Sequence, residues 1–312
     1  MKHALRLTLV ALAFAFGALI ARSQEAQPGS AGSPRIYDAQ GRPATLEQVL
    51  DAAVASEVVF VGEIHNDAGA HQLELRLLQE TFARLMPKTN AGVSERRLVL
   101  SLEMFERDVQ SVLDEYLAGL IQERQFLAAS RPWNNYQTDY RPLIEFAHAH
   151  ELPVMAANAP ERYVNRVGRL GRESLKALSP GALAWLAPLP YGVASPAYAA
   201  KFNEVMAAGG PGGAHSNPFL LDAQTLRDAT MAHAIAEQLK REKRALVLHV
   251  NGNFHSEGRL GTPEQLRALR PQTRMLVLSI VPAPVNASPD AKQFIGLGDF
   301  VFVTEAAATG RF

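Results

Sequence analysis

The sequence predicts an α/β fold in which helices flank a mostly parallel central sheet. Short apolar runs rich in β-branched residues recur along the chain, and such runs are typical of strands that are buried on both faces. Segments with the apolar spacing of amphipathic helices separate these runs. Strands and helices therefore alternate, which is the order expected of a parallel sheet covered by helices on both sides.

Composition limits the classes of function. The chain has 312 residues, enough for one large α/β domain. Its 31 Lys and Arg balance 31 Asp and Glu, so the basic excess typical of nucleic-acid-binding proteins is missing and no nucleic-acid partner is expected. Cysteine is absent, which excludes disulfides, thiolate metal sites, a Cys nucleophile and lipid attachment at a cysteine.

The N-terminal residues have the pattern of a secretory signal peptide. Basic residues precede an apolar run at residues 7–20, which is short for a membrane span, and a small-x-small site ends at Ser23. We therefore expect a signal peptide at 1–23, a flexible lead-in at 24–40 and a single domain at 41–312. The protein is expected to be exported, either periplasmic or membrane-associated through an uncleaved N-terminal helix.

The first buried strand is expected at Val58–Val61, where every residue is β-branched or aromatic. A helix with Thr45 as its N-cap precedes it and extends to Ala55. The next helix, Ala70–Leu85, carries leucines on one side. The rest of the first half is predicted as strands at Arg97–Met104 and Val154–Ala157, helices at Val109–Ala118, Gln122–Ala129, Leu143–His150 and Pro160–Leu170, and a polar-aromatic loop at Arg131–Tyr140.

A Pro/Gly-rich irregular insertion at Ser179–Pro218 interrupts the alternation of strands and helices. It holds six prolines and a cluster of glycines, and a long irregular segment in a compact domain is usually a functional flap or disordered. Regular elements then resume, with helices at Asp222–Arg241 and Pro263–Leu269 and strands at Ala245–Val250, Arg274–Val281 and Phe300–Val303.

Two Gly-x-x-His segments each follow an apolar strand. Glu63 and His65 lie in the first segment, and His255 ends the second. Because parallel strands end at one edge of a sheet, these side chains are expected to converge there, joined by Glu103 from the end of another strand. Two His and one or two Glu suit a divalent metal that keeps an open position for water or substrate. The alternative is that both histidines only hydrogen-bond to neighbouring loops.

Five segments in order give the chain a resemblance to a known family. The segments are VVFVGEIHNDAGAHQLELRLL, LVLSLEMFERDVQSVLDEYLAG, WNNYQTDYRPLIEFAHAHELPVMAANAPERYV, DAQTLRDATMAHAIAEQL and VLHVNGNFHSEGRLGTP. With them the chain resembles the ChaN family of haem-binding uptake proteins, in a superfamily with Tiki, TraB and erythromycin-esterase-like proteins. The resemblance spans about residues 57 to 263, most of the chain that follows the expected signal peptide.

The resemblance implies a haem-binding protein of iron or haem acquisition, which carries or stores haem outside the cytoplasm. It also implies a homodimer that stacks two haems, a tyrosine as the iron ligand, and delivery involving an outer-membrane haem receptor or transport system. Tyr191 is the favoured ligand because it follows Leu-Pro in the irregular segment; Tyr198 and Tyr163 are the other candidates. Residues expected near the haem propionates are Arg162, Arg166 and Lys201.

A second interpretation comes from the wider superfamily, because Tiki members resemble metalloproteases that use two Gly-x-x-His motifs. Under it, Glu63, His65, Glu103 and His255 bind a divalent metal or act on its water, as in a metal-dependent hydrolase. A hybrid is also open, in which the polar cleft persists beside a haem surface and Glu63, His65 and His255 line the cleft near the haem. Some ChaN-like proteins resemble lipoproteins, but the lack of cysteine closes that anchoring route here.

Overall fold

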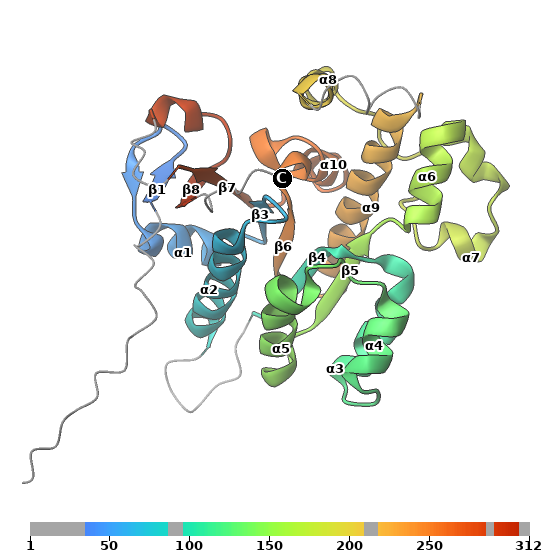
Figure 1. The fold of residues 1–312 in the computed structure, drawn as a ribbon, viewed down its shortest axis with the longest axis horizontal. Coiled ribbons are helices and arrows are strands. Elements are labelled where there is room, and N and C mark those ends of the chain that lie inside the picture. The colour runs from blue at the N-terminus through green and yellow to red at the C-terminus, as the bar shows by residue number, and fades with distance from the viewer. Residues whose placement is uncertain (1–34, 87–95, 209–217, 285–289, 306–312) are drawn as a thin grey trace, which may run out of the picture. The chain divides into compact units, whose positions relative to one another are not determined.

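The computed structural model describes residues 35–86, 96–208, 218–284 and 290–305. They form an α/β fold around an eight-stranded, mostly parallel sheet, which confirms the predicted class (Figure 1). The expected signal peptide lies outside the described residues. None of the helices in the described ranges combines the length and the apolar character that crossing a membrane requires.

The sheet has the strand order β2-β1-β8-β7-β3-β6-β4-β5. Strands β8 through β5 in this order run parallel, while β1 is antiparallel to both β8 and β2. The strands are β1 (Arg35–Asp38), β2 (Pro43–Ala44), β3 (Val58–Glu63), β4 (Leu98–Glu106), β5 (Val154–Asn158), β6 (Leu246–Gly252), β7 (Met275–Ala283) and β8 (Phe300–Glu305).

Strand β3 lies in the middle of the sheet, between β6 and β7. The two strands that follow β3 in the sequence, β4 and β5, lie beyond β6 on one side of the sheet. Strands β7 and β8 lie on the other side of β3. The register pairs Glu63, the last residue of β3, with Gly252, the last residue of β6. The two Gly-x-x-His segments therefore leave the sheet side by side at its carboxyl edge. Ligands of open α/β sheets bind at such a point, where the strand order reverses.

Ten α-helices and six short helical turns connect the strands within the described residues. Helix α1 begins with a complete capping box, in which Thr45 and Gln48 exchange hydrogen bonds, as the sequence predicts for the cap. The helices are α1 (Leu46–Ala55), α2 (Ala68–Leu85), α3 (Gln110–Leu117), α4 (Glu123–Ser130), α5 (Arg141–Ala149), α6 (Glu161–Leu170), α7 (Pro180–Leu183), α8 (Pro196–Ala208), α9 (Leu220–Arg241) and α10 (Thr262–Leu269). The turns are η1 (Arg107–Val109), η2 (Tyr136–Tyr140), η3 (Arg172–Ala177), η4 (Asn253–His255), η5 (Glu257–Arg259) and η6 (Ala291–Phe294).

Helices cover both faces of the sheet. On one face Leu50 of α1, Leu77 of α2 and Ile144 of α5 pack against the strands; on the other face Ile235 of α9 and Leu266 of α10 do so. Figure 1 shows α2 and α5 on one side of the central strands and α9 and α10 on the other. Burial on both faces explains why the strand sequences are continuous apolar runs.

Two segments expected to be irregular contain regular structure in part. Residues 35–38, placed in the flexible lead-in, form β1, because Ile36 is buried and its strand pairs with β8. The Pro/Gly-rich insertion contains α7 and the 13-residue α8. Proline begins both helices, where its missing N–H costs nothing, so the prolines here mark helix starts. Residues 209–217 of the insertion lie outside the described residues.

Smaller differences concern element ends. Strand β3 continues to Glu63, past the predicted Val61, because its parallel pairing with β6 persists to that residue. The predicted loop Arg131–Tyr140 ends in the π-helical turn η2. The turn directs Tyr140 back toward the carboxyl edge of the sheet.

Candidate functional site

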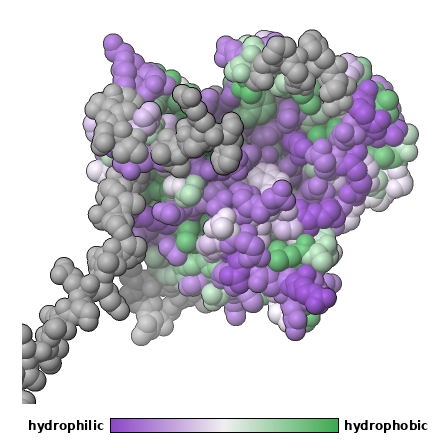
Figure 2. Space-filling model, in the orientation of Figure 1, coloured by the Kyte–Doolittle hydropathy of each residue, from purple (hydrophilic) through white to green (hydrophobic). Residues whose placement is uncertain are grey.

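The two Gly-x-x-His segments meet at the carboxyl edge of β3 and β6. Glu63 is buried, whereas the side chain of His65 is 44% exposed. His255 follows β6 in η4 and is buried. In Figure 2 the surface below α8 is hollowed and coloured hydrophilic, so the polar groups gather in a concave region. The structure thus brings the predicted residues to one edge; their chemical role remains a prediction.

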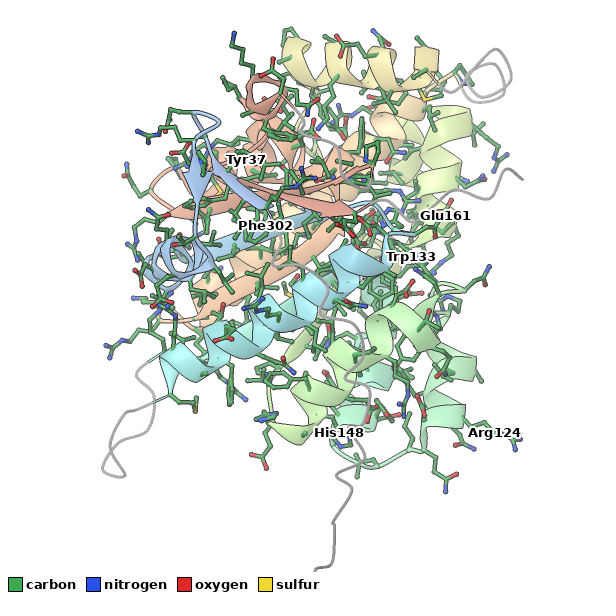
Figure 3. All side chains as sticks on the ribbon, turned by 60° about the vertical axis from the view of Figure 1, so that its left-hand side comes forward. Tyr37, Arg124, Trp133, His148, Glu161 and Phe302 are labelled. Atoms are coloured by element: carbon green, nitrogen blue, oxygen red, sulfur yellow. The ribbon has the colours of Figure 1, made fainter. Side chains whose placement is uncertain are left out.

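The first half of the site consists of Glu63, His65 and the side chains that contact them, and Glu63 makes its central hydrogen bonds. Its Oε1 accepts hydrogen bonds from His65 Nδ1 at 2.8 Å and from the Tyr140 hydroxyl. The indole of Trp133 packs edge-on against the His65 ring, with 4.5 Å between centroids, and Figure 3 shows Trp133 near the start of α2. The predicted polar-aromatic loop therefore orients His65 through the packing of Trp133 and orients Glu63 through the hydroxyl of Tyr140.

His255 is held between two carboxylates in the second half of the site. Its Nδ1 donates to Asp228 Oδ1 at 2.8 Å, and its Nε2 lies 3.3 Å from Glu103 Oε1. Asp228, on α9, also accepts hydrogen bonds from the hydroxyls of Thr262 and Tyr198. Because Nδ1 donates to Asp228, Nε2 is the nitrogen that faces Glu103. When Nε2 is also protonated, His255 and Glu103 form an ion pair.

Gly252 allows the two halves to approach each other. A Cβ at this position would lie 2.8 Å from both Cε1 and Nε2 of His65, and 3.8 Å from Glu103 Oε2. The N–H of Gly252 donates to Glu103 Oε2 at 2.8 Å. Gly252 therefore leaves space for the His65 imidazole and donates its backbone N–H to the Glu103 carboxylate. Through these two contacts it brings His65 and Glu103 close together.

The electrostatics of the edge favour charged imidazoles and ionised carboxylates. Burial alone lowers the pKa of His255, but Glu103 and Asp228 raise it above its usual value. The pKa of His65 is likewise raised, because the hydrogen bond to Glu63 and the charge of Glu103 outweigh burial. The pKa of Glu103 is lowered by both histidines and the Gly252 N–H, despite burial. Each group thus keeps its neighbour charged.

The predicted metal set Glu63, His65, Glu103 and His255 reaches the edge as two linked pairs. Within the described residues, the carboxylate and imidazole atoms that lie within 4.8 Å of one another in a group of three belong to Glu63, His71 and Glu74. His71 and Glu74 were not part of the metal set predicted from the sequence.

Sequence reasoning also missed Tyr140 and Asp228. Asp228 is in the middle of a helix and Tyr140 ends a loop, and neither position has a spacing that points to the histidines. Their place in the site follows from tertiary contacts, because α9 packs against α10 and η2 packs against α2.

The three candidate tyrosines differ in access. Tyr191 is buried with its hydroxyl donating to the Asp222 carbonyl at 3.1 Å, and the Arg172 guanidinium lies 3.9 Å from its ring centroid. Tyr198 is buried against Asp228. Burial is the main cause that raises the pKa of both phenols above the usual value. Tyr163 is half-buried on α6.

The three candidate propionate partners all have protein partners. Arg162 lies 4.5 Å from the centroid of the Tyr163 ring and pairs with Asp108 at 2.5 Å. Arg166 donates to the Ser174 carbonyl at 3.1 Å. Lys201 lies close to the second half of the site, since it donates to the Glu257 carbonyl at 3.1 Å. Arg162, whose side chain is 48% exposed, is the most exposed of the three.

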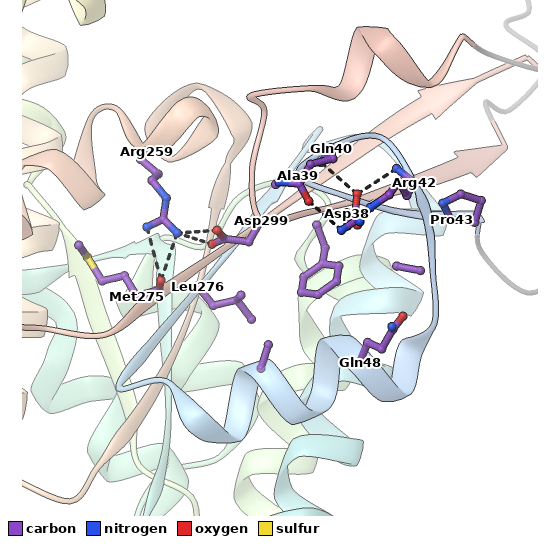
Figure 4. Close-up of a pocket in the computed structure, with 13 residues that line it drawn as sticks. Asp38, Ala39, Gln40, Arg42, Pro43, Gln48, Arg259, Met275, Leu276 and Asp299 are labelled. Atoms are coloured by element: carbon purple, nitrogen blue, oxygen red, sulfur yellow. Dashed lines mark hydrogen bonds and ion pairs between the residues drawn. The ribbon is translucent and has the colours of Figure 1, made fainter.

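A pocket of about 440 Å³ lies away from this edge, beside β1 and α1 (Figure 4). Its charged groups are already paired: Arg259 binds Asp299 through both carboxylate oxygens at 2.6 Å, and Arg42 binds Asp38 at 2.7 Å. The pocket brings together neither the histidines nor the buried carboxylates. The carboxyl edge, which has both, is therefore the candidate functional site.

Comparison with known proteins places the chain among relatives of this architecture. The sequence profile of a family described as "Haem-binding uptake, Tiki superfamily, ChaN" matches residues 49–266. No curated protein sequence matches the chain. Among solved structures it is similar to ChaN of Campylobacter jejuni, described with cofacial haem binding, at a TM-score of 0.62 and 15% identity over 88% of this chain and 97% of that chain.

Two further structures are more distantly similar. They are the type III effector HopBA1, with a TM-score of 0.48 and 10% identity over 89% of this chain and all of that chain (100%), and a mutant erythromycin esterase, EreC, in its open conformation, with a TM-score of 0.43 and 11% identity over 90% of this chain and 85% of that one. At these identities, structural likeness is evidence of fold alone.

Proposed function

This chain belongs to the ChaN family of haem-binding uptake proteins in the Tiki superfamily, and from that premise we propose that it binds haem outside the cytoplasm and carries or stores it during iron acquisition. The observation that carries the proposal is the family match, which spans residues 49–266 and includes both Gly-x-x-His segments. The expected export signal supports the location outside the cytoplasm.

We propose a tyrosine as the iron ligand. A bound haem supplies ferric iron, for which a phenolate is a suitable axial ligand. What favours Tyr163 is that it is half-buried and lies beside Arg162, a cation suited to a propionate. Tyr191, favoured by its place in the sequence, and Tyr198 would each have to give up a hydrogen bond and leave a buried position first. Support for a haem surface near the edge comes from Ile64, which is 46% exposed beside His65.

The experiment is a titration with ferric haem, followed by absorbance, of the wild type and of Tyr163→Phe, Tyr191→Phe and Tyr198→Phe. The ligand variant is expected to lose the phenolate-type band and to bind haem at least ten-fold more weakly. The other two variants serve as matched controls, because each removes one hydroxyl. If all three keep the wild-type spectrum, tyrosine ligation by these residues is wrong; if the wild type itself shows no Soret shift, haem binding is wrong.

We also propose that haem binding produces a homodimer, as the family resemblance implies, and that an outer-membrane receptor or transport system is the delivery partner. The measurement is the mass of the protein with and without haem. A mass that doubles on haem addition supports the homodimer, and a monomer with bound haem contradicts it.

A second candidate function is a metal-dependent hydrolase. It is favoured by the convergence of Glu63, His65, Glu103 and His255 at the carboxyl edge, an arrangement that a haem carrier does not need. In that case the carboxylates and imidazoles would hold a divalent metal, which would supply a bound water of lowered pKa. Metal content, together with haem binding by His65→Ala and His255→Ala, separates the two functions. Metal-free protein whose haem affinity survives both substitutions supports the carrier.

A further inference from the structure

A group of three ligand-type side chains lies behind the edge, where β3 meets the start of α2. Glu63 ends β3, and His71 and Glu74 lie three residues apart on the inward face of α2. All three are buried, at 1%, 4% and 0% exposure. Their ligand atoms lie within 4.8 Å of one another. Neither the haem proposal nor the hydrolase proposal uses His71 or Glu74.

The hydrogen bonds of His71 determine which of its nitrogens is available. Its Nε2 lies 3.0 Å from the backbone carbonyl oxygen of His65, which can only accept, so Nε2 carries a proton and donates it. Nδ1 then faces Glu74 Oε2 at 3.0 Å and Glu63 Oε2 at 3.1 Å. Histidines that bind metals are typically held in this way, with one ring nitrogen donating to a carbonyl and the other facing the ion.

The ring is held by more than one contact. The same His65 carbonyl also accepts from Asn135 Nδ2 at 2.7 Å, and the ring of Tyr140 packs edge-on against the imidazole at 4.8 Å between centroids. These groups come from the chain between α4 and α5, which covers the cluster. His71 is therefore positioned with its Nδ1 directed between the two carboxylates.

Two carboxylates lie beside a single imidazole in this buried cluster. Glu74 Oε1 is buried and accepts no hydrogen bond from a described residue, and Glu63 Oε2 lies 3.1 Å from His71 Nδ1 without a well-oriented hydrogen bond. Two buried carboxylates this close need a cation or a proton between them, because an uncompensated buried charge is costly.

We propose that Glu63, His71 and Glu74 form a buried binding site for a divalent first-row transition-metal ion. The donor set, one imidazole nitrogen and carboxylate oxygens, suits Mn²⁺, Fe²⁺ or Zn²⁺. Two carboxylates neutralise a divalent ion, and the unpartnered oxygens become ligands. The ion would join the end of β3 to the first turns of α2. This site goes beyond the proposed function, since it uses His71 and Glu74 and does not include His255.

The test is the metal content, by elemental analysis, of protein purified without chelators as wild type, Glu74→Gln and His255→Gln. Glu74→Gln keeps the shape of the side chain and removes a ligand, whereas His255→Gln alters only the set at the carboxyl edge. About one ion per chain is expected in the wild type and in His255→Gln, with a loss of at least ten-fold in Glu74→Gln. Metal that is lost in His255→Gln and kept in Glu74→Gln places the ion at the edge and overturns the proposal.

Thermal unfolding with excess Mn²⁺ or Zn²⁺, compared with EDTA, provides a second readout. The wild type is expected to gain about 5 °C, because an ion that binds only the folded state stabilises it. Glu74→Gln is expected to gain nothing. A wild type that holds no metal and shows no shift overturns the proposal and indicates a proton shared by Glu63 and Glu74.

If Glu74→Gln does not fold, Mn²⁺ broadening of backbone NMR signals in the wild type locates the ion. Signals of residues 70–75 are expected to broaden before those of residues 254–256; the reverse order contradicts the site. Haem titration of the same preparations is independent of this result, so failure of the metal site and failure of haem binding are separately visible.

Discussion

Among single residues, Gly252 determines how closely His65 approaches β6. Its backbone, at φ −59° and ψ 140°, is open to any residue, so the absence of a Cβ matters for space alone. A methyl group there would meet the imidazole at 2.8 Å. The partly exposed ring has room to rotate, which moves it away from Glu63 and not into the core.

We expect Gly252→Ala to fold but to displace His65. Loss of the Glu63 hydrogen bond should bring the pKa of His65 back toward 6.5, and the free energy of unfolding should fall by about 1 kcal/mol. An NMR titration of His65 measures the first effect and urea unfolding the second. Gly181→Ala is the control, because a Cβ there meets nothing within 4 Å. An unchanged His65 titration contradicts the steric role of Gly252.

The raised pKa of His255 predicts how stability varies with pH in metal-free protein. A histidine whose pKa is higher in the folded state than its unfolded value of 6.5 stabilises the fold fully below pH 6.5. That contribution is lost as the pH rises through the folded-state pKa. The free energy of unfolding of wild type relative to His255→Gln should therefore be greatest near pH 6 and should decline toward pH 9. Urea unfolding across this range measures it, and a constant difference contradicts it.

Individual site residues were predictable only where the sequence places them beside a strand end. Glu63, His65, Glu103 and His255 all follow apolar runs, and the structure brings all four to one edge. Asp228 lies in the middle of α9, and its importance comes from the contact with His255 that folding creates. No periodicity signals such a contact, because the two residues are brought together by packing of helix on sheet.

At the level of elements, α8 is joined to the site by its side chains. Tyr198 donates to Asp228, its ring lies 5.2 Å from that of Phe254, and Lys201 donates to the Glu257 carbonyl. The helix therefore borders the second half of the site. Sequence reasoning took this stretch as irregular because its prolines are frequent, whereas the residues after Pro196 are mostly good helix formers.

Removing one hydroxyl tests this connection. Tyr198→Phe deprives the buried Asp228 carboxylate of a donor and should lower the free energy of unfolding by about 1.5–3 kcal/mol. Tyr191→Phe, whose hydroxyl bonds a neutral carbonyl, should cost only about 0.5–1.5 kcal/mol. Hydrogen exchange should also quicken over Pro196–Ala208 in the first variant alone. Equal costs, with unchanged exchange, contradict the attachment of α8 through Tyr198.

For the whole molecule, alternation of strands and helices was sufficient to predict the class but not the strand order. Apolar runs report that a strand is buried on both faces, and they contain nothing about which strand lies beside it. The neighbours of β3 in the sheet are β6 and β7, whereas the next strand in sequence is β4. The antiparallel β1 was missed because a strand of four residues is too short to show a pattern.

This strand order predicts that the first three-quarters of the chain does not fold alone. A fragment ending at residue 241 keeps β3, β4 and β5 but lacks both partners of β3. Far-UV circular dichroism during urea titration should show no cooperative transition for the fragment and a single one for the full chain. A cooperative transition in the fragment contradicts the central role of β3.

The position of β3 also affects how the nascent chain folds during synthesis. Residue 58 leaves the ribosome 188 positions ahead of residue 246, with which the β6 partner begins. Throughout that interval both edges of an apolar strand lack their final partners, and unpaired strand edges invite aggregation. Closing so long a loop makes folding slow. We expect the nascent chain to depend on chaperones until its last strands emerge.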